Sequence, residues 1–120
     1  MPTQANLLIQ REMDITVVDL QDARILDINQ IESIGEQLFK LVDKMDRKKL
    51  ILDFSKVRHM GSAAIGMIIS LNEKSKAIKG TLVISGVRPD VMKIFTIMRL
   101  HKLLKFAPNL NDAMAQFGKN

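Results

Sequence analysis

The stretch that decides the fold is Leu50–Met67, which reads Leu-Ile-Leu-Asp-Phe-Ser-Lys-Val-Arg-His-Met-Gly-Ser-Ala-Ala-Ile-Gly-Met. It opens with an apolar run typical of a strand, passes through polar residues that indicate a loop, and ends in small and aliphatic residues that predict a helix. Ser62 falls at or beside the N-cap of that helix, where a hydroxyl can accept a hydrogen bond from a first-turn amide. The same amides and the helix dipole favour an anion such as phosphate.

Strands and helices alternate on both sides of this stretch. Upstream, the β-branched run within Ile15–Leu20 predicts a strand, and a turn at residues 12–14 would pair it with an earlier one. Asn29 and Glu32 have the spacing of a capping box, which predicts the start of an amphipathic helix. The elements expected in order are strands at Leu7–Gln10, Ile15–Leu20 and Ile25–Leu26, a helix reaching Met45, a strand at Leu50–Phe54, a helix from Ser62 to about Lys79 that stops at Gly80, a strand at Thr81–Ser85 that turns at Gly86, a helix from Pro89, a strand at Leu103–Phe106, and a helix capped by Asn109.

This order predicts an α/β sandwich with a mixed sheet and helices packed mainly on one face. A chain of 120 residues predicts a single domain, with its core at about residues 7–117. A hydrophobic fraction of 47% with 26% charged residues excludes a disordered chain. The sequence has no cysteine, which excludes disulfides and thiolate metal sites, and no apolar run approaches the ~20 residues that span a bilayer.

The formal net charge of +5 raises the question of an anionic partner. The basic residues are scattered, and the absence of Tyr and Trp leaves only Phe to stack on bases. Lysines near the end of a helix also complement its dipole. The sequence therefore favours solvated basic faces over direct nucleic-acid binding.

The segment Ile51–Gly66 resembles the signature of the STAS fold of bacterial anti-sigma factor antagonists, in which two aliphatic residues precede Asp-Leu-Ser-x-Val-x-x-Met-Asp-Ser-Ser-Gly-Leu-Gly. Asp53, Ser55, Val57, Met60 and Ser62 match this pattern. Three of the departures from the pattern bear on function: Gly61 stands where the family has Asp, Ala63 removes a second hydroxyl, and Ala64 replaces a Gly.

The resemblance implies a function for the serine. In that family the serine placed like Ser62 is phosphorylated by a partner that is both a serine protein kinase and an anti-sigma factor. The protein would then be a cytoplasmic, non-enzymatic module that regulates transcription by binding its partner unmodified and releasing it when phosphorylated. The alternative is a STAS scaffold subunit, not switched by phosphorylation, in a signalling or lipid-transport complex.

Several residues are candidates for the partner-binding surface. Ser62 has a second interpretation as a plain helix cap. Asp27 lies where the family has an acidic residue near the phosphoacceptor, or simply begins a helix. Asp53 either holds loop amides, which we favour, or acts on Ser62. The residues expected to bind the partner are Asp27, Asp53, Ser55, Met60, Gly61, Ser62, Ala63 and Met67.

No catalytic, cofactor or metal site is expected. His59 and His101 lack ligand spacing. Gly61 and Gly66 lack the Lys-Ser/Thr ending of a phosphate-binding loop. Ser62, His59 and Asp53 fall in one short segment, but a triad requires a geometry that sequence proximity does not provide. A small α/β enzyme or nucleotide binder has only its fold class in its favour. The oligomeric state is left open.

Overall fold

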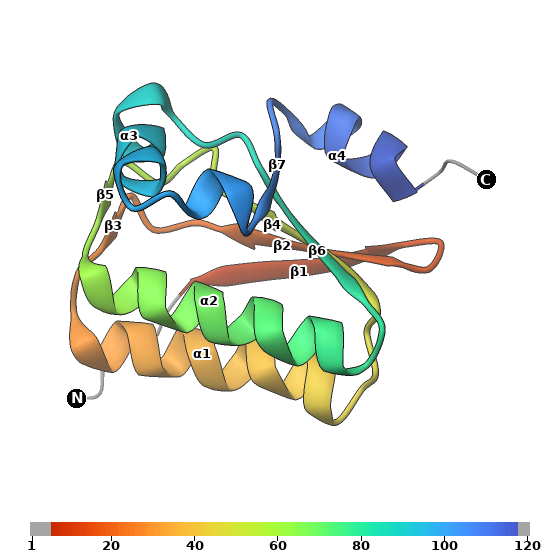
Figure 1. Ribbon diagram of the computed structural model, residues 1–120. Helices are drawn as coiled ribbons and strands as arrows, with labels where there is room; N and C mark the ends of the chain where they lie inside the picture. The colour runs from red at the N-terminus through yellow and green to blue at the C-terminus, as the bar shows by residue number, and fades with distance from the viewer. Residues whose placement is uncertain (1–5, 118–120) are drawn as a thin grey trace.

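The computed structural model describes residues 6–117. Its centre is a five-stranded sheet in the order β1-β2-β4-β6-β7 (Figure 1). β1 pairs with β2 in the antiparallel sense, and every other neighbouring pair is parallel. The predicted mixed sheet is confirmed. The strands are β1 (Leu7–Glu12), β2 (Ile15–Leu20), β4 (Lys49–Asp53), β6 (Thr81–Ser85) and β7 (Lys105–Ala107).

Four α-helices cover this sheet. α1 (Ile28–Asp43) and α2 (Ser62–Ala77) lie side by side on one face and run in the same direction, so their N-termini meet at one end of the molecule (Figure 1). α3 (Pro89–Ile97) and the short 3-10 helix η1 (Leu100–Lys102) contribute to the same core, whereas α4 (Leu110–Phe117) covers the opposite face. The expected packing of helices mainly on one face is confirmed.

The alternation of side chains along the strands explains these two layers. Leu50 and Leu52 of β4 point into the larger core, which the first three helices cover, while Ile51 points toward α4. All three are 0% exposed. A central parallel strand buried on both faces has this continuous apolar run. Burial of each such side chain stabilises the fold by roughly 1.5–3 kcal/mol.

A second, two-stranded sheet holds the two loops that precede α1 and α2. β3 (Arg24–Ile25) pairs in parallel with β5 (His59–Met60). The amides of Arg58 and His59 both donate to the carbonyl of Ala23, at 2.8 and 3.0 Å. The sequence predicted a loop at residues 59–60, because two residues are too few to show a period. This small sheet fixes the starts of the two helices relative to each other.

The structure corrects several predicted boundaries. The predicted capping box at Asn29 and Glu32 is wrong. The N-cap of α1 is Asp27, and the helix begins at Ile28. The helix ends at Asp43 rather than Met45. The third strand is Arg24–Ile25, one residue earlier than expected. The last strand lies at Lys105–Ala107 because residues 100–102 form the 3-10 helix first.

Gly80 was expected to end α2, but α2 ends at Ala77 and the left-handed residue after it is Lys79, with φ of 61°. Gly80 is needed for another reason. A Cβ there would lie 2.7 Å from the carbonyl oxygen of Lys48, closer than real atoms approach. The glycine therefore allows the chain entering β6 to pass close to the chain entering β4. Gly86 turns the chain as predicted, with φ of 69°.

Candidate functional site

The candidate site lies at the N-terminus of α2. Gly61 is the N-cap, in an extended conformation (φ −96°, ψ 170°) with no side chain to cap the helix. Its amide donates to the carbonyl of Ile25 at 3.2 Å, which ties the helix start to β3. Ser62 is the first helical residue and is exposed. Its hydroxyl forms no hydrogen bond within residues 6–117, so it is open to an incoming protein.

Two exposed aliphatic side chains lie where the chain enters α1, whose N-terminus is close to that of α2. Leu26 is 44% exposed and Ile28 is 65% exposed. A Cβ built on Gly61 would lie 3.6 Å from Cδ2 of Leu26, so this side chain borders the helix start directly. Sequence reasoning missed both aliphatic residues, because a single Leu or Ile beside a helix cap looks like a core residue. Leu26 therefore presents an exposed apolar side chain next to the start of α2, and Ile28 presents another at the start of α1.

Asp27 separates these two aliphatic residues, and it has a structural task. Its Oδ1 accepts hydrogen bonds from the amides of Asn29 and Gln30, at 2.8 and 3.1 Å. The carboxylate therefore caps α1, in the position where negative charge also complements the helix dipole. These hydrogen bonds agree with the interpretation of Asp27 as a residue that begins a helix. Asp27 is also exposed, and its contact with a partner stays a prediction.

Asp22 anchors the segment that leads to Asp27. Asn6 donates to its two carboxylate oxygens, from the amide at 3.2 Å and from Nδ2 at 2.9 Å. Nε2 of the buried Gln30 donates to the same carboxylate at 3.0 Å and to the carbonyl of Arg24 at 2.9 Å. Burial would raise the pKa of Asp22, but these hydrogen bonds outweigh it and hold that pKa below the ordinary 3.8.

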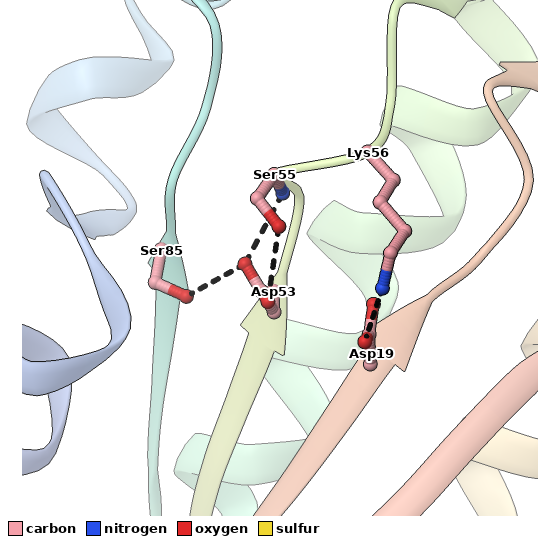
Figure 2. A network of polar contacts seen from close by, with 5 residues as sticks. All are labelled: Asp19, Asp53, Ser55, Lys56 and Ser85. Atoms are coloured by element: carbon pink, nitrogen blue, oxygen red, sulfur yellow. Dashed lines mark hydrogen bonds and ion pairs between the residues drawn. The ribbon is translucent and has the colours of Figure 1, made fainter.

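Asp53 and Ser55 belong to a different network at the carboxyl end of β4 (Figure 2). Oδ1 of Asp53 accepts from the amide of Ser55 at 3.1 Å, and Oδ2 accepts from the Ser55 hydroxyl at 3.2 Å. The Ser85 hydroxyl, which is fully buried, donates to Oδ1 at 3.4 Å. Within residues 6–117, the carboxylate has no hydrogen bond to Ser62. The geometry matches the favoured role of holding loop amides.

An ion pair flanks this network on the neighbouring strand. Nζ of Lys56 lies 2.8 Å from Oδ2 of Asp19, as Figure 2 shows. The hydrogen bond and the charge of Asp19 raise the pKa of Lys56, with a smaller contribution from the charge of Asp53. Asp19, Asp53 and Ser85 are register partners on β2, β4 and β6, so they form one polar row across the sheet.

The two methionines of the predicted surface are placed differently. Met60 is only 8% exposed and belongs to the larger core, so its assignment to an exposed partner-binding surface is wrong. Pairing of β5 with β3 directs this side chain inward. Met67 is half-buried against α1, where its Cγ lies 3.3 Å from a Cβ built on Gly35. Gly61 is half-buried and Ala63 is exposed, both beside Ser62.

The basic residues are partly neutralised by ion pairs on the surface. In addition to Lys56, three lysines pair with aspartates at 2.6 to 2.9 Å. The hydrogen bond to Lys49 also lowers the pKa of Asp14, despite an opposing effect of burial. Two of these pairs, Lys48–Asp46 and Lys49–Asp14, involve the run at residues 47–49, which was the densest basic cluster in the sequence.

Within residues 6–117, no group of three or more His, Cys, Asp or Glu side chains is arranged to hold a metal ion. No helix in the same part of the chain is both long and apolar enough to cross a membrane.

Comparison with solved structures gives the same fold. An anti-sigma factor antagonist from Mycobacterium paratuberculosis superposes with a TM-score of 0.81 at 19% identity, covering 95% of this chain and 94% of that one. SpoIIAA, a cell fate determinant of Bacillus solved in its phosphorylated form, superposes with a TM-score of 0.73 at 15% identity, covering 93% and 99% of the two chains. These likenesses show a shared fold.

Sequence comparison points the same way. BtrV of Bordetella bronchiseptica, described as an anti-sigma factor antagonist, is 24% identical over 86 residues, which are 72% of this chain and 73% of BtrV. The family model for the STAS domain matches residues 6–113, almost the whole described chain. The protein therefore belongs to the STAS domain family.

Proposed function

We propose that the protein is an anti-sigma factor antagonist that binds a kinase-type anti-sigma factor in the cytoplasm and lets it go when Ser62 is phosphorylated. The observation that carries this proposal is the exposed hydroxyl of Ser62, which lacks a hydrogen bond at an uncapped helix start. The relatives described as anti-sigma factor antagonists support the same role. The protein would act by binding rather than by catalysis.

The surroundings of Ser62 supply the release mechanism. A phosphoserine carries nearly two negative charges at neutral pH and is much bulkier than a hydroxyl. In a docked complex the exposed Leu26 and Ile28 would face the partner beside this group. Burying the phosphate among apolar side chains without a matching cation costs several kcal/mol, because an isolated charge loses its hydration. The unmodified surface binds, and the phosphorylated surface is repelled.

A second function has one observation in its favour. Gly61 provides no carboxylate beside the acceptor hydroxyl, so the chain lacks a group that the family pattern places there. A STAS scaffold subunit in a signalling or lipid-transport complex would need no such carboxylate. This alternative predicts stable assembly that is indifferent to the state of Ser62.

The test combines partner capture with site mapping. Tagged wild-type protein and the Ser62→Ala and Ser62→Asp variants are used to capture partners from a lysate of the source organism, which are then identified by mass spectrometry. We expect Ser62→Ala to retain a kinase-type anti-sigma factor and Ser62→Asp to lose most of it, because only aspartate adds a charge to the interface. ATP added to the captured wild-type complex should phosphorylate Ser62.

Two outcomes would refute the proposal. Phosphorylation at another residue, with Ser62 untouched, would remove the switch. Equal capture of the same partners by the Ser62→Ala and Ser62→Asp variants, in an assembly without a kinase, would support the scaffold function instead.

A further inference from the structure

An open groove runs between α1 and α2 on the outer surface of the molecule. It has a volume of about 380 Å³. Ile31 and Phe39 of α1 and Met67 of α2 line its apolar floor, and Glu32 and Glu36 of α1 line one rim. The two helices are parallel neighbours, so the groove follows their common direction (Figure 1). This volume is at the low end of the range for ligand pockets and also suits one or two inserted side chains.

Two glycines in the walls of this groove differ in what they do for the fold. A Cβ on Gly35 would lie 3.3 Å from Cγ of Met67, so this glycine allows the two helices to approach each other. A Cβ on Gly66 would meet nothing within 4 Å. Gly66 therefore lowers helix stability without improving any contact inside the chain. What its missing side chain provides is open space in the groove wall.

The groove is also acidic at its rim. Glu32 and Glu36 are exposed, and within residues 6–117 neither takes part in an ion pair. Lys74 lies over the floor, with its Nζ 5.1 Å from the centre of the Phe39 ring. That lysine is already paired with Asp43 at 2.9 Å. The two glutamates are thus available to a cation from outside the chain.

The groove continues the surface that carries the candidate serine. Ser62 and Gly66 are four residues apart on α2, so they lie on the same face of the helix, one turn from each other. Both residues are exposed. A protein that covers Ser62 therefore reaches the groove without leaving this face.

We propose that this groove is a docking site for a helical segment of the partner protein that inserts an aliphatic side chain flanked by arginine or lysine. The aliphatic group packs over Gly66 onto the floor of Ile31, Phe39 and Met67, and the basic residues pair with Glu32 and Glu36. This inference rests on the proposed function, because it describes how the same partner is held.

The groove can be tested without the natural partner. Two helical peptides of equal length serve as probes: one presents a leucine flanked by arginines on one face, and the other has glutamates in place of the arginines. Binding is followed by the amide signals of ¹⁵N-labelled protein. We expect the arginine peptide to bind with a dissociation constant of ~1 mM or tighter. The signals of Gly35 and Gly66 should shift, and higher salt should weaken binding.

Matched variants locate the effect. Gly66→Leu fills the groove from a position where a Cβ meets nothing within 4 Å, and should weaken peptide binding about tenfold. Ala77→Leu places the same leucine side chain at the exposed end of α2, outside the groove, and should change nothing. The double charge reversal Glu32→Lys with Glu36→Lys should favour the glutamate peptide. The single reversal Glu73→Lys, on an exposed position beyond the groove, should not.

The results separate this inference from the proposed function. The groove assignment would be overturned if peptide binding shifted signals outside the groove, or if Gly66→Leu left binding unchanged. Equal binding of the two probes, or no binding at millimolar peptide, would overturn it as well. The protein could also bind the arginine peptide in the groove but capture no kinase. That result would support the groove assignment and refute the proposed switch.

Discussion

The two ends of the loop between β4 and α2 carry similar polar residues and use them in opposite ways. At the β4 end, the carboxylate of Asp53 is hydrogen-bonded to Ser55 and to the buried Ser85. At the α2 end, the hydroxyl of Ser62 is exposed and has no hydrogen bond within residues 6–117. The carboxylate of Asp53 uses its hydrogen bonds to stabilise the fold, whereas the hydroxyl of Ser62 is available to bind another molecule.

This difference predicts how the two ends respond to substitution. Changes around Asp53 should lower the free energy of unfolding and leave partner binding by the folded protein unchanged. Changes around Ser62 should alter partner binding and barely affect stability. A residue at the β4 end that changed binding without changing stability would break the comparison. It would then support the predicted partner contacts of Asp53 and Ser55.

The largest stability effect is expected for Gly86→Ala at the β4 end. Gly86 has φ of 69°, and a Cβ there would lie 3.1 Å from Oδ1 of Asp53 and 3.2 Å from Cβ of Ser55. The left-handed conformation alone costs an alanine about 1–2 kcal/mol, and the crowding of the network adds to it. We expect a loss of about 2–3 kcal/mol in the free energy of unfolding, measured by urea denaturation.

Gly66→Ala is the matched control for Gly86→Ala, because the same methyl group is added where it meets nothing. It should stabilise the protein by about 0.5–1 kcal/mol, the helix preference of alanine over glycine. A Gly86→Ala variant as stable as the wild type would show that the network around Asp53 is loose and that the two ends differ less than the geometry indicates.

The elements of the fold could be predicted from sequence because they depend on local patterns. The apolar run of Leu50–Leu52 and the helical period of α1 are visible within a few residues. Caps and short pairings were less accessible. Asp27 and Asn29 are both good N-cap residues, and only the packed helix shows which one accepts the amides. β5 has two residues and exists because β3 lies beside it.

The candidate site divides in the same way. The position of Ser62 followed from the strand–loop–helix pattern, because a helix start is a local property. The exposure of Leu26 and Ile28 did not, since the chain gives no sign of which aliphatic residues the fold leaves uncovered. Gly35 and Gly66 look alike in the sequence, and only the distance between α1 and α2 distinguishes a spacing glycine from one that opens a groove.

A smaller effect is expected for Asp53→Ala, which removes the acceptor and keeps the backbone. The amide and hydroxyl of the exposed Ser55 can bond to water instead, so their loss costs little. The Ser85 hydroxyl is 0% exposed and would lose its partner, which costs about 1–2 kcal/mol. Urea denaturation should show this loss, and partner capture by the folded protein should be unchanged.

Ser55→Ala is the control for Asp53→Ala, since it removes only the exposed member of the network. It should lower stability by less than about 0.5 kcal/mol, as is usual for surface substitutions. Were Ser55→Ala as costly as Asp53→Ala, the stabilisation would reside in the loop and not in the buried hydroxyl of Ser85.

Leaving the control variants aside, the smallest stability effect, and the most informative about function, is expected for Gly61→Asp at the α2 end. The N-cap conformation there is extended, which any residue can adopt, and a new Cβ would be in ordinary contact with Leu26 at 3.6 Å. Aspartate can accept a first-turn amide and complement the helix dipole, so we expect a gain of about 0.3–1 kcal/mol. Under the proposed function, the added carboxylate beside Ser62 should also speed its phosphorylation, measured by mass spectrometry against time.

Gly61→Asn separates the two effects, because asparagine caps a helix about as well as aspartate but carries no charge. Stability raised by both variants, with faster phosphorylation only for aspartate, would mean that the missing carboxylate acts on the hydroxyl and that this chain is a slower version of the switch. Equal phosphorylation rates in both variants and the wild type would mean that the kinase needs no carboxylate from this loop. A loss of stability in both variants would instead show that the α2 end is packed more tightly than its exposure indicates. The two ends of the loop would then not differ as proposed, because the α2 end would also contribute to the stability of the fold.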